Sequence, residues 1–243
     1  MNRQAVNPYL PSWEYIPDGE PHVFNGRVYV YGSHDRFNAP IFCVNDYVCW
    51  SAPVEDLSEW RYEGVIYRKK QDPKNPLGYH LLFAPDVCQG PDGRYYLYYA
   101  FDFLGIMSVA VCDTPAGEYK FLGHIHYADG TLWGRRRGDQ LPFDPGVLAD
   151  DDGRVWLYSG FYNAVPAILT GGHKLRCDGG TVLELEKDMV TIKTEPRVIF
   201  PKKGPGAFQG HEFFEASSIR KEGKTYIFVY SSRHNHELCY ATS

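Results

Sequence analysis

The chain lacks several signals that would point directly to a function. None of its 243 residues lies in an apolar run long enough to span a bilayer, and residues 1–10 contain no apolar segment of signal-peptide length. We therefore expect a soluble, cytoplasmic protein. The sequence also contains no glycine-rich phosphate loop, no Ser or Cys nucleophile triad and no zinc motif. These absences argue against nucleotide-dependent, acyl-transfer and zinc-dependent enzymes.

Basic charge and paired cysteines are scarce as well. The formal net charge is −5, and we interpret the basic run Arg135–Arg137 as a solvated loop. A nucleic-acid partner is therefore not expected, because such partners require a basic face. The cysteines show no metal-ligand spacing, and we predict that they are reduced and buried, with no metal bound. They are Cys43, Cys49, Cys88, Cys112, Cys177 and Cys239.

No amphipathic helix is evident, whereas aromatic residues are abundant at 16% and favour strands. Four times a Gly-Arg or Gly-Lys pair opens an aromatic strand. The four segments are 26–31, 93–98, 153–158 and 223–228. Their central aromatics recur at intervals of 67, 60 and 70 residues. Short strands and glycine turns repeated at this length predict the blades of a β-propeller.

A carboxylate precedes each of these aromatic strands. The segments that carry it are 20–23, 85–87, 144–147 and 215–219. Because equivalent strands of successive blades converge on one axis, we expect acids at the heads of the innermost strands to gather in a single site. The repetition across blades, more than any one acid, favours a functional interpretation.

The repeats are expected at 18–66, 80–125, 140–200 and 211–243, within a single all-β domain. Each should add a third strand and then an outer strand after the aromatic strand. The last repeat has sequence for a third strand and none for an outer one. We therefore predict about four blades, a C-terminally incomplete propeller and an open side between the first and fourth repeats.

Three segments resemble glycoside hydrolase family 43. They are Phe83–Val87, Asp144–Val147 with Asp150–Tyr158, and Phe214–Ser217 followed by the Gly-Lys strand. The resemblance implies a five-bladed β-propeller that acts on xylosyl and arabinosyl linkages. It also implies roles for individual residues. Glu215 matches the general acid, although the family's Glu-Gly-Pro is Glu-Ala-Ser here. Asp144 matches the aspartate that raises the pKa of the acid and orients the substrate.

Two residues are candidates for the general base. The family's Asp-Pro pair aligns with Glu20-Pro21, whereas Asp18 supplies the expected residue type two positions earlier. Residues 18 and 20 would share one strand face, so either side chain could reach the axis. Two other acids are weighed and set aside: Asp86 as a residue that binds backbone amides, and Glu212 as a weaker competitor for the acid.

Further residues are predicted to contact substrate. The resemblance implies this for His34 and Asp35, and Trp13, Phe83 and Phe214 could stack on a sugar ring. No cofactor is expected to be required, but the resemblance allows a structural calcium ion on the propeller axis, with His234 and His236 near it. Calcium prefers oxygen ligands, so two histidines are weak evidence.

These features predict an inverting glycosidase of the β-xylosidase or α-L-arabinofuranosidase type. It would act on plant cell-wall oligosaccharides and could form a homo-oligomer. Two alternatives stay open: a non-catalytic propeller that binds carbohydrate, and a retaining hydrolase acting on fructosyl units. Inversion needs two carboxyls about 6.5–9.5 Å apart, and retention about 5 Å.

Overall fold

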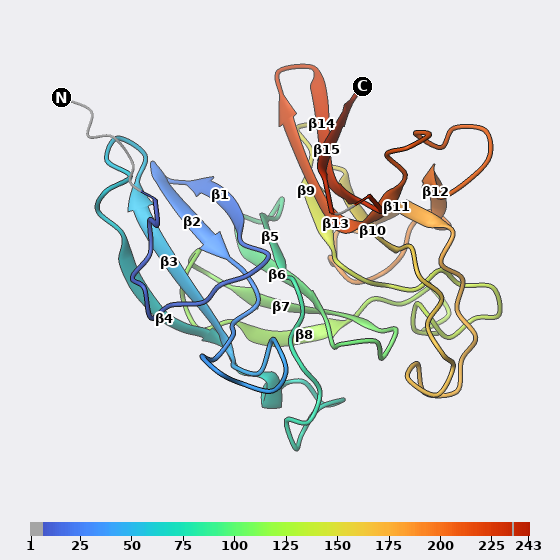
Figure 1. The fold of residues 1–243 in the computed structure, drawn as a ribbon, viewed down its shortest axis with the longest axis horizontal. Helices are drawn as coiled ribbons and strands as arrows, with labels where there is room; N and C mark the ends of the chain where they lie inside the picture. The colour runs from blue at the N-terminus through green and yellow to red at the C-terminus, as the bar shows by residue number, and fades with distance from the viewer. Residues whose placement is uncertain (1–6, 235) are drawn as a thin grey trace.

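Four antiparallel sheets follow one another along the chain, one for each predicted repeat (Figure 1). The computed structural model describes residues 7–234 and 236–243. Within them the single helical element is a short 3-10 turn, η1 (Lys69–Gln71), and no helix there is long and apolar enough to cross a membrane. The predicted all-β propeller architecture is therefore confirmed.

The sheets run in chain order from the inner to the outer strand. The first two comprise β1 (Glu20–Phe24), β2 (Arg27–Tyr31), β3 (Tyr47–Pro53) and β4 (Arg61–Tyr67), then β5 (Asp86–Gln89), β6 (Tyr95–Ala100), β7 (Met107–Cys112) and β8 (Lys120–His124). The last two comprise β9 (Gly146–Ala149), β10 (Val155–Phe161), β11 (Gly179–Leu185) and β12 (Arg197–Pro201), then β13 (Phe213–Glu222), β14 (Thr225–Ser232) and β15 (Leu238–Thr242).

The recurrent glycine marks the turn between the first and second strands of each sheet. Its φ is positive in all four repeats, at Gly26, Gly93, Gly153 and Gly223. A residue with a side chain is strained in that conformation, so glycine there fixes the hairpin and thereby the register of the aromatic strand behind it.

The aromatic strands supply the core between neighbouring sheets. Tyr31, Tyr67 and Tyr99 are fully buried between the first and second sheets. Tyr98 and Leu157 are buried between the second and third. Each buried aromatic contributes about 1.5–3 kcal/mol by leaving water, so the packing of whole sheet faces holds the blades in place.

Asp86 connects three inner strands. Its Oδ1 lies 2.6 Å from His22 Nε2 in β1, and its Oδ2 accepts a hydrogen bond of 2.6 Å from the Val147 amide in β9. It is completely buried. The prediction that Asp86 binds backbone amides is confirmed.

The first and fourth sheets also meet at their inner strands. The Ser218 hydroxyl donates to Glu20 Oε1 at 2.8 Å, and the Arg220 guanidinium forms an ion pair with the same carboxylate. From this contact the two sheets diverge outward (Figure 1). Among the described residues the fourth sheet has three strands, ending with β15, and no fifth sheet is present. The incomplete propeller stays a prediction.

Candidate active site

A cavity of about 490 Å³ lies where the inner strands begin. Asp18, just ahead of β1, Asp144, just ahead of β9, and Glu215, within β13, all line it. Of the four acids that the repeat pattern predicted to gather, Asp144 and Glu215 line this cavity together with Asp18, whereas Glu20 and Asp86 do not. A second cavity of about 580 Å³ lies towards the opposite ends of the same strands, but a single carboxylate, Asp151, lines it.

Glu215 has the electrostatics of a general acid. Burial raises its pKa to about 7, and the negative charge of Asp18 adds to the increase. The carboxyl therefore carries a proton over much of the range below neutrality and can donate it. His236 Nδ1 lies 3.7 Å from Glu215 Oε1 and lines the same cavity.

Asp18 occupies a turn that aims its carboxylate into the cavity. Its φ is 56°, in the left-handed region that aspartate tolerates better than most residues. Ser33 Oγ donates to Asp18 Oδ2 at 3.1 Å. Burial raises the pKa of Asp18, the Ser33 hydrogen bond opposes that increase, and the charge of Asp35 adds to it.

Asp144 is the most buried of the three. Burial raises its pKa well above the usual value, and the charges of Glu215 and Asp18 raise it further. Its Oδ2 accepts a hydrogen bond of 3.1 Å from the Ala216 amide. We expected Asp144 to raise the pKa of the acid by its charge, but the charge that acts on Glu215 is that of Asp18.

Glycine permits the close approach on which this contact depends. A Cβ on Gly146 would lie 2.5 Å from the Ser217 carbonyl oxygen. Because real Cβ atoms do not come that close, only glycine lets β9 lie against β13 here. The approach brings Asp144 to the backbone beside Glu215.

Glu20 lies outside the cavity lining. It is held by Ser218 and Arg220 at the junction of β1 and β13. The expectation that residues 18 and 20 share a strand face is wrong, because β1 begins at Glu20 and Asp18 precedes it in a turn. Alternation along a strand does not apply across that turn.

Glu212 also lies outside the cavity lining. Its carboxylate lies 3.5 Å from Arg233 Nε and 3.7 Å from His234 Nε2, and a backbone hydrogen bond lowers its pKa. A lowered pKa does not suit a proton donor at neutral pH.

The predicted substrate contacts divide into two groups. Asp35, Phe83 and Phe214 line the cavity. His34 does not: its Nδ1 lies 2.9 Å from the Asp46 carbonyl oxygen and its Nε2 lies 3.0 Å from Glu14 Oε1.

Trp13 is likewise absent from the lining. It is 66% exposed, and its ring centroid lies 5.9 Å from that of Trp50. Neither Trp13 nor His34 is therefore placed against a sugar in this cavity.

Several lining residues were not predicted. They are Pro17, Phe42, Cys43, Ala84, Phe103, Phe143 and Phe161, with His236 considered earlier only as an ion neighbour. One signal could have revealed part of the set, since Phe143 directly precedes Asp144 as Phe214 precedes Glu215. The loop phenylalanines Phe42 and Phe103 carry no such signal.

Residues 17–242 match the family described as glycosyl hydrolases family 43. A xylosidase/arabinosidase of Thermoclostridium stercorarium is 61% identical over the whole of this chain, which spans half of that relative's length. A xylosidase/arabinosidase of Bacteroides ovatus is 31% identical, with 96% of this chain and 75% of that protein covered. The solved structure of CoXyl43, from a compost microbial metagenome, is 26% identical and superposes with a TM-score of 0.72 over 99% of this chain and 77% of that one. CoXyl43 is a GH43 beta-xylosidase/alpha-arabinofuranosidase, solved in complex with xylotriose in a calcium-free form.

Proposed function

The chain belongs to glycosyl hydrolases family 43, and we propose that it hydrolyses xylosyl or arabinofuranosyl linkages in plant cell-wall oligosaccharides by an inverting mechanism. The observation that carries the proposal is the pairing of Glu215, with its pKa raised to about 7, with Asp18 in one cavity. Hydrolysis needs one carboxyl that holds a proton and another that is ionised. The family relatives named xylosidase/arabinosidase support the choice of sugars.

Each of the three acids has a distinct task. Glu215 gives its proton to the oxygen of the leaving group as the glycosidic bond breaks. Asp18 takes a proton from a water molecule, whose oxygen attacks the anomeric carbon from the opposite face. Asp144, through the Ala216 amide, holds the backbone next to Glu215.

The walls suit the flat apolar faces of a sugar. Phenylalanines line much of the cavity, at positions 42, 83, 103, 143, 161 and 214. C–H groups of a pyranose or furanose ring pack on such surfaces, while Asp35 and His236 offer polar contacts to hydroxyl groups.

No redox or nucleotide cofactor enters this reaction. A candidate calcium site is formed by Glu20, His22 and Asp86, whose ligand atoms lie within 4.8 Å of one another. They do not fit it: calcium takes six to eight oxygen ligands, and Arg220 already provides a positive charge to Glu20. We propose that hydrolysis proceeds without calcium, so treatment with EDTA should leave the rate unchanged.

The deciding experiment is a panel of para-nitrophenyl β-xyloside, α-arabinofuranoside and β-fructofuranoside, with proton NMR of the first-formed anomer. We expect hydrolysis of the first two and inversion at the anomeric carbon. Retention would contradict the proposed mechanism, and cleavage of the fructoside alone would favour the fructosyl alternative. Binding of xylo-oligosaccharides by calorimetry without hydrolysis would favour a non-catalytic module. Light scattering on the same sample tests the predicted homo-oligomer.

A further inference from the structure

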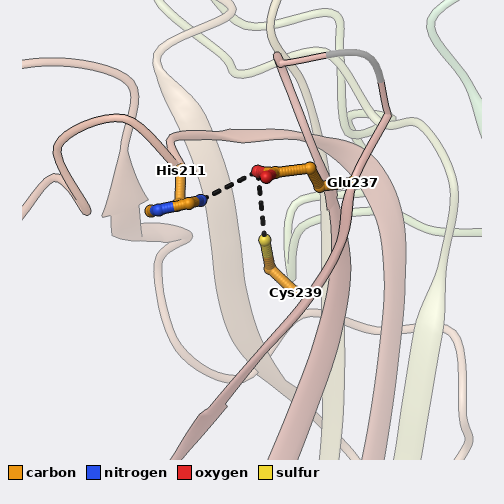
Figure 2. A group of neighbouring side chains, drawn as sticks. All are labelled: His211, Glu237 and Cys239. Carbon is orange, nitrogen blue, oxygen red and sulfur yellow. Dashed lines mark hydrogen bonds and ion pairs between the residues drawn. The ribbon is translucent and has the colours of Figure 1, made fainter.

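Three potential metal ligands of different types meet on the fourth sheet, away from the cavity lining. His211 Nδ1 lies 2.8 Å from Glu237 Oε2, and Cys239 Sγ lies 3.9 Å from the same oxygen. All three ligand atoms lie within 4.8 Å of one another. Figure 2 shows the imidazole and the thiol directed at one carboxylate.

The fold fixes each of these side chains. Cys239 lies in β15 and Glu237 directly precedes that strand, and their side chains meet on one side of it. His211 comes from the loop that leads into β13, and its carbonyl oxygen accepts a hydrogen bond of 2.8 Å from the Tyr230 hydroxyl. Ser232 Oγ donates to Glu237 Oε2 at 3.0 Å. Two separate segments of the chain thus converge on one oxygen.

We propose that His211, Glu237 and Cys239 bind a divalent transition metal of the zinc type. The donor set decides the class of ion: an imidazole nitrogen, a thiolate sulfur and a carboxylate oxygen suit Zn²⁺, whereas Ca²⁺ and Mg²⁺ take oxygen ligands. Zinc at its usual bond lengths separates neighbouring ligands by about 3.3–3.6 Å. The contact of 2.8 Å between His211 and Glu237 must lengthen, and that of 3.9 Å between Cys239 and Glu237 must shorten, by about half an ångström or less to reach that geometry.

The fourth coordination position faces solvent. The His211 side chain is 59% exposed and that of Glu237 is 45% exposed, so a water molecule can complete a tetrahedron. The ion enters where the His211–Glu237 contact now lies, and the Cys239 thiol loses its proton to solvent on binding. The Ser232 hydroxyl remains as the outer partner that orients the carboxylate.

A metal here joins the two segments that carry residues of the cavity. Glu215 follows His211 by four residues, and His236 is the direct neighbour of Glu237. The site therefore fastens the entrance of β13 to the β14–β15 hairpin. It stands independently of the proposed hydrolase activity.

The test is titration of the untagged, reduced chain with Co²⁺. One equivalent should produce the near-ultraviolet absorption of a cobalt–thiolate bond, and Cys239→Ser should abolish that band. Cys112→Ser is the matched control, because Cys112 is the other half-buried cysteine while the remaining four are buried. Ser232→Ala should weaken binding roughly 10-fold. A chain that shows no band, or a band that survives C239S, overturns the proposal.

Thermal unfolding gives a second, independent readout. A hundredfold excess of Zn²⁺ over its dissociation constant should raise the melting temperature of the wild type by roughly 5–10 °C. C239S and H211A should show no such rise. Equal increases in the wild type and both variants would place the zinc elsewhere and contradict the site.

Discussion

The Ala216 amide donates a hydrogen bond of 3.1 Å to Asp144 Oδ2 and so ties the backbone beside Glu215 to the head of the third sheet. The residue that follows the proposed acid is thus held by a carboxyl from a neighbouring blade. Asp144 has a raised pKa, so the pair does not depend on a negative charge at Asp144.

Glu215→Gln should lower the hydrolysis of natural oligosaccharides by about 10²–10⁴-fold, because proton donation to the leaving oxygen is lost. Activated aryl glycosides, whose leaving groups need less protonation, should lose much less. Steady-state kinetics on xylobiose and on a dinitrophenyl xyloside measure the difference. Glu212→Gln, three residues earlier and outside the cavity, is the control and should retain wild-type rates. Unchanged turnover of xylobiose by E215Q would remove Glu215 from the mechanism.

Asp18→Asn should be inactive on natural and activated substrates alike, because both need the attacking water to be deprotonated. Glu20→Gln should retain most activity, since Glu20 contacts Arg220 and Ser218 instead of lining the cavity. A parallel assay of the two variants, with circular dichroism to verify folding, decides between them. The reverse pattern would assign the base to Glu20.

The architecture was readable from the sequence because it depends on local chemistry. In each repeat a glycine indicates a hairpin turn and an alternating aromatic run indicates the strand that follows it. The four sheets could therefore be placed to within a few residues. Asp144 and Glu215 were found for the same reason, since each stands a few residues ahead of the glycine that opens such a strand.

The remainder depends on contacts between distant segments. Glu20 forms an ion pair with Arg220, some 200 residues away in the sequence, and it therefore lies outside the cavity that Asp18 lines. The His34 imidazole forms hydrogen bonds with Glu14 and with the Asp46 carbonyl oxygen, and the sequence positions of these residues do not predict that pairing. Phe42 and Phe103 reach the cavity from loops, whose paths have no periodic pattern.

Asp144→Asn should retain more activity than Asp144→Ala. Burial raises the pKa of Asp144 and so favours its neutral form, and an amide oxygen can accept the Ala216 hydrogen bond in its place. Alanine removes the acceptor, and displacement of Glu215 by about 1 Å can cost about 10²-fold. Values of kcat for the two variants test this. If both lose activity equally, Asp144 acts through its charge.

The pH profile of kcat/KM should be bell-shaped. Glu215 must be protonated, so activity should fall as the pH rises through about 7, the pKa to which burial raises this group. Asp18 must be ionised, so activity should also fall in acid, with a midpoint above the ordinary aspartate value because its pKa is raised. E215Q assayed on an activated aryl glycoside should lose the alkaline limb. An alkaline limb that persists in E215Q would belong to another group.

Gly146→Ala should disturb the site without touching a carboxylate. The new Cβ would lie 2.5 Å from the Ser217 carbonyl oxygen, so β13 must move away from β9. We expect a loss of about 1–3 kcal/mol in the free energy of unfolding, as for other overpacked positions, and a drop in activity as Glu215 shifts. Gly123→Ala is the control, because its Cβ would meet Val190 at an ordinary 3.4 Å. Urea unfolding of both variants, together with their kcat values, tests the effect. Wild-type stability in G146A would show that the close approach of β9 and β13 is not required.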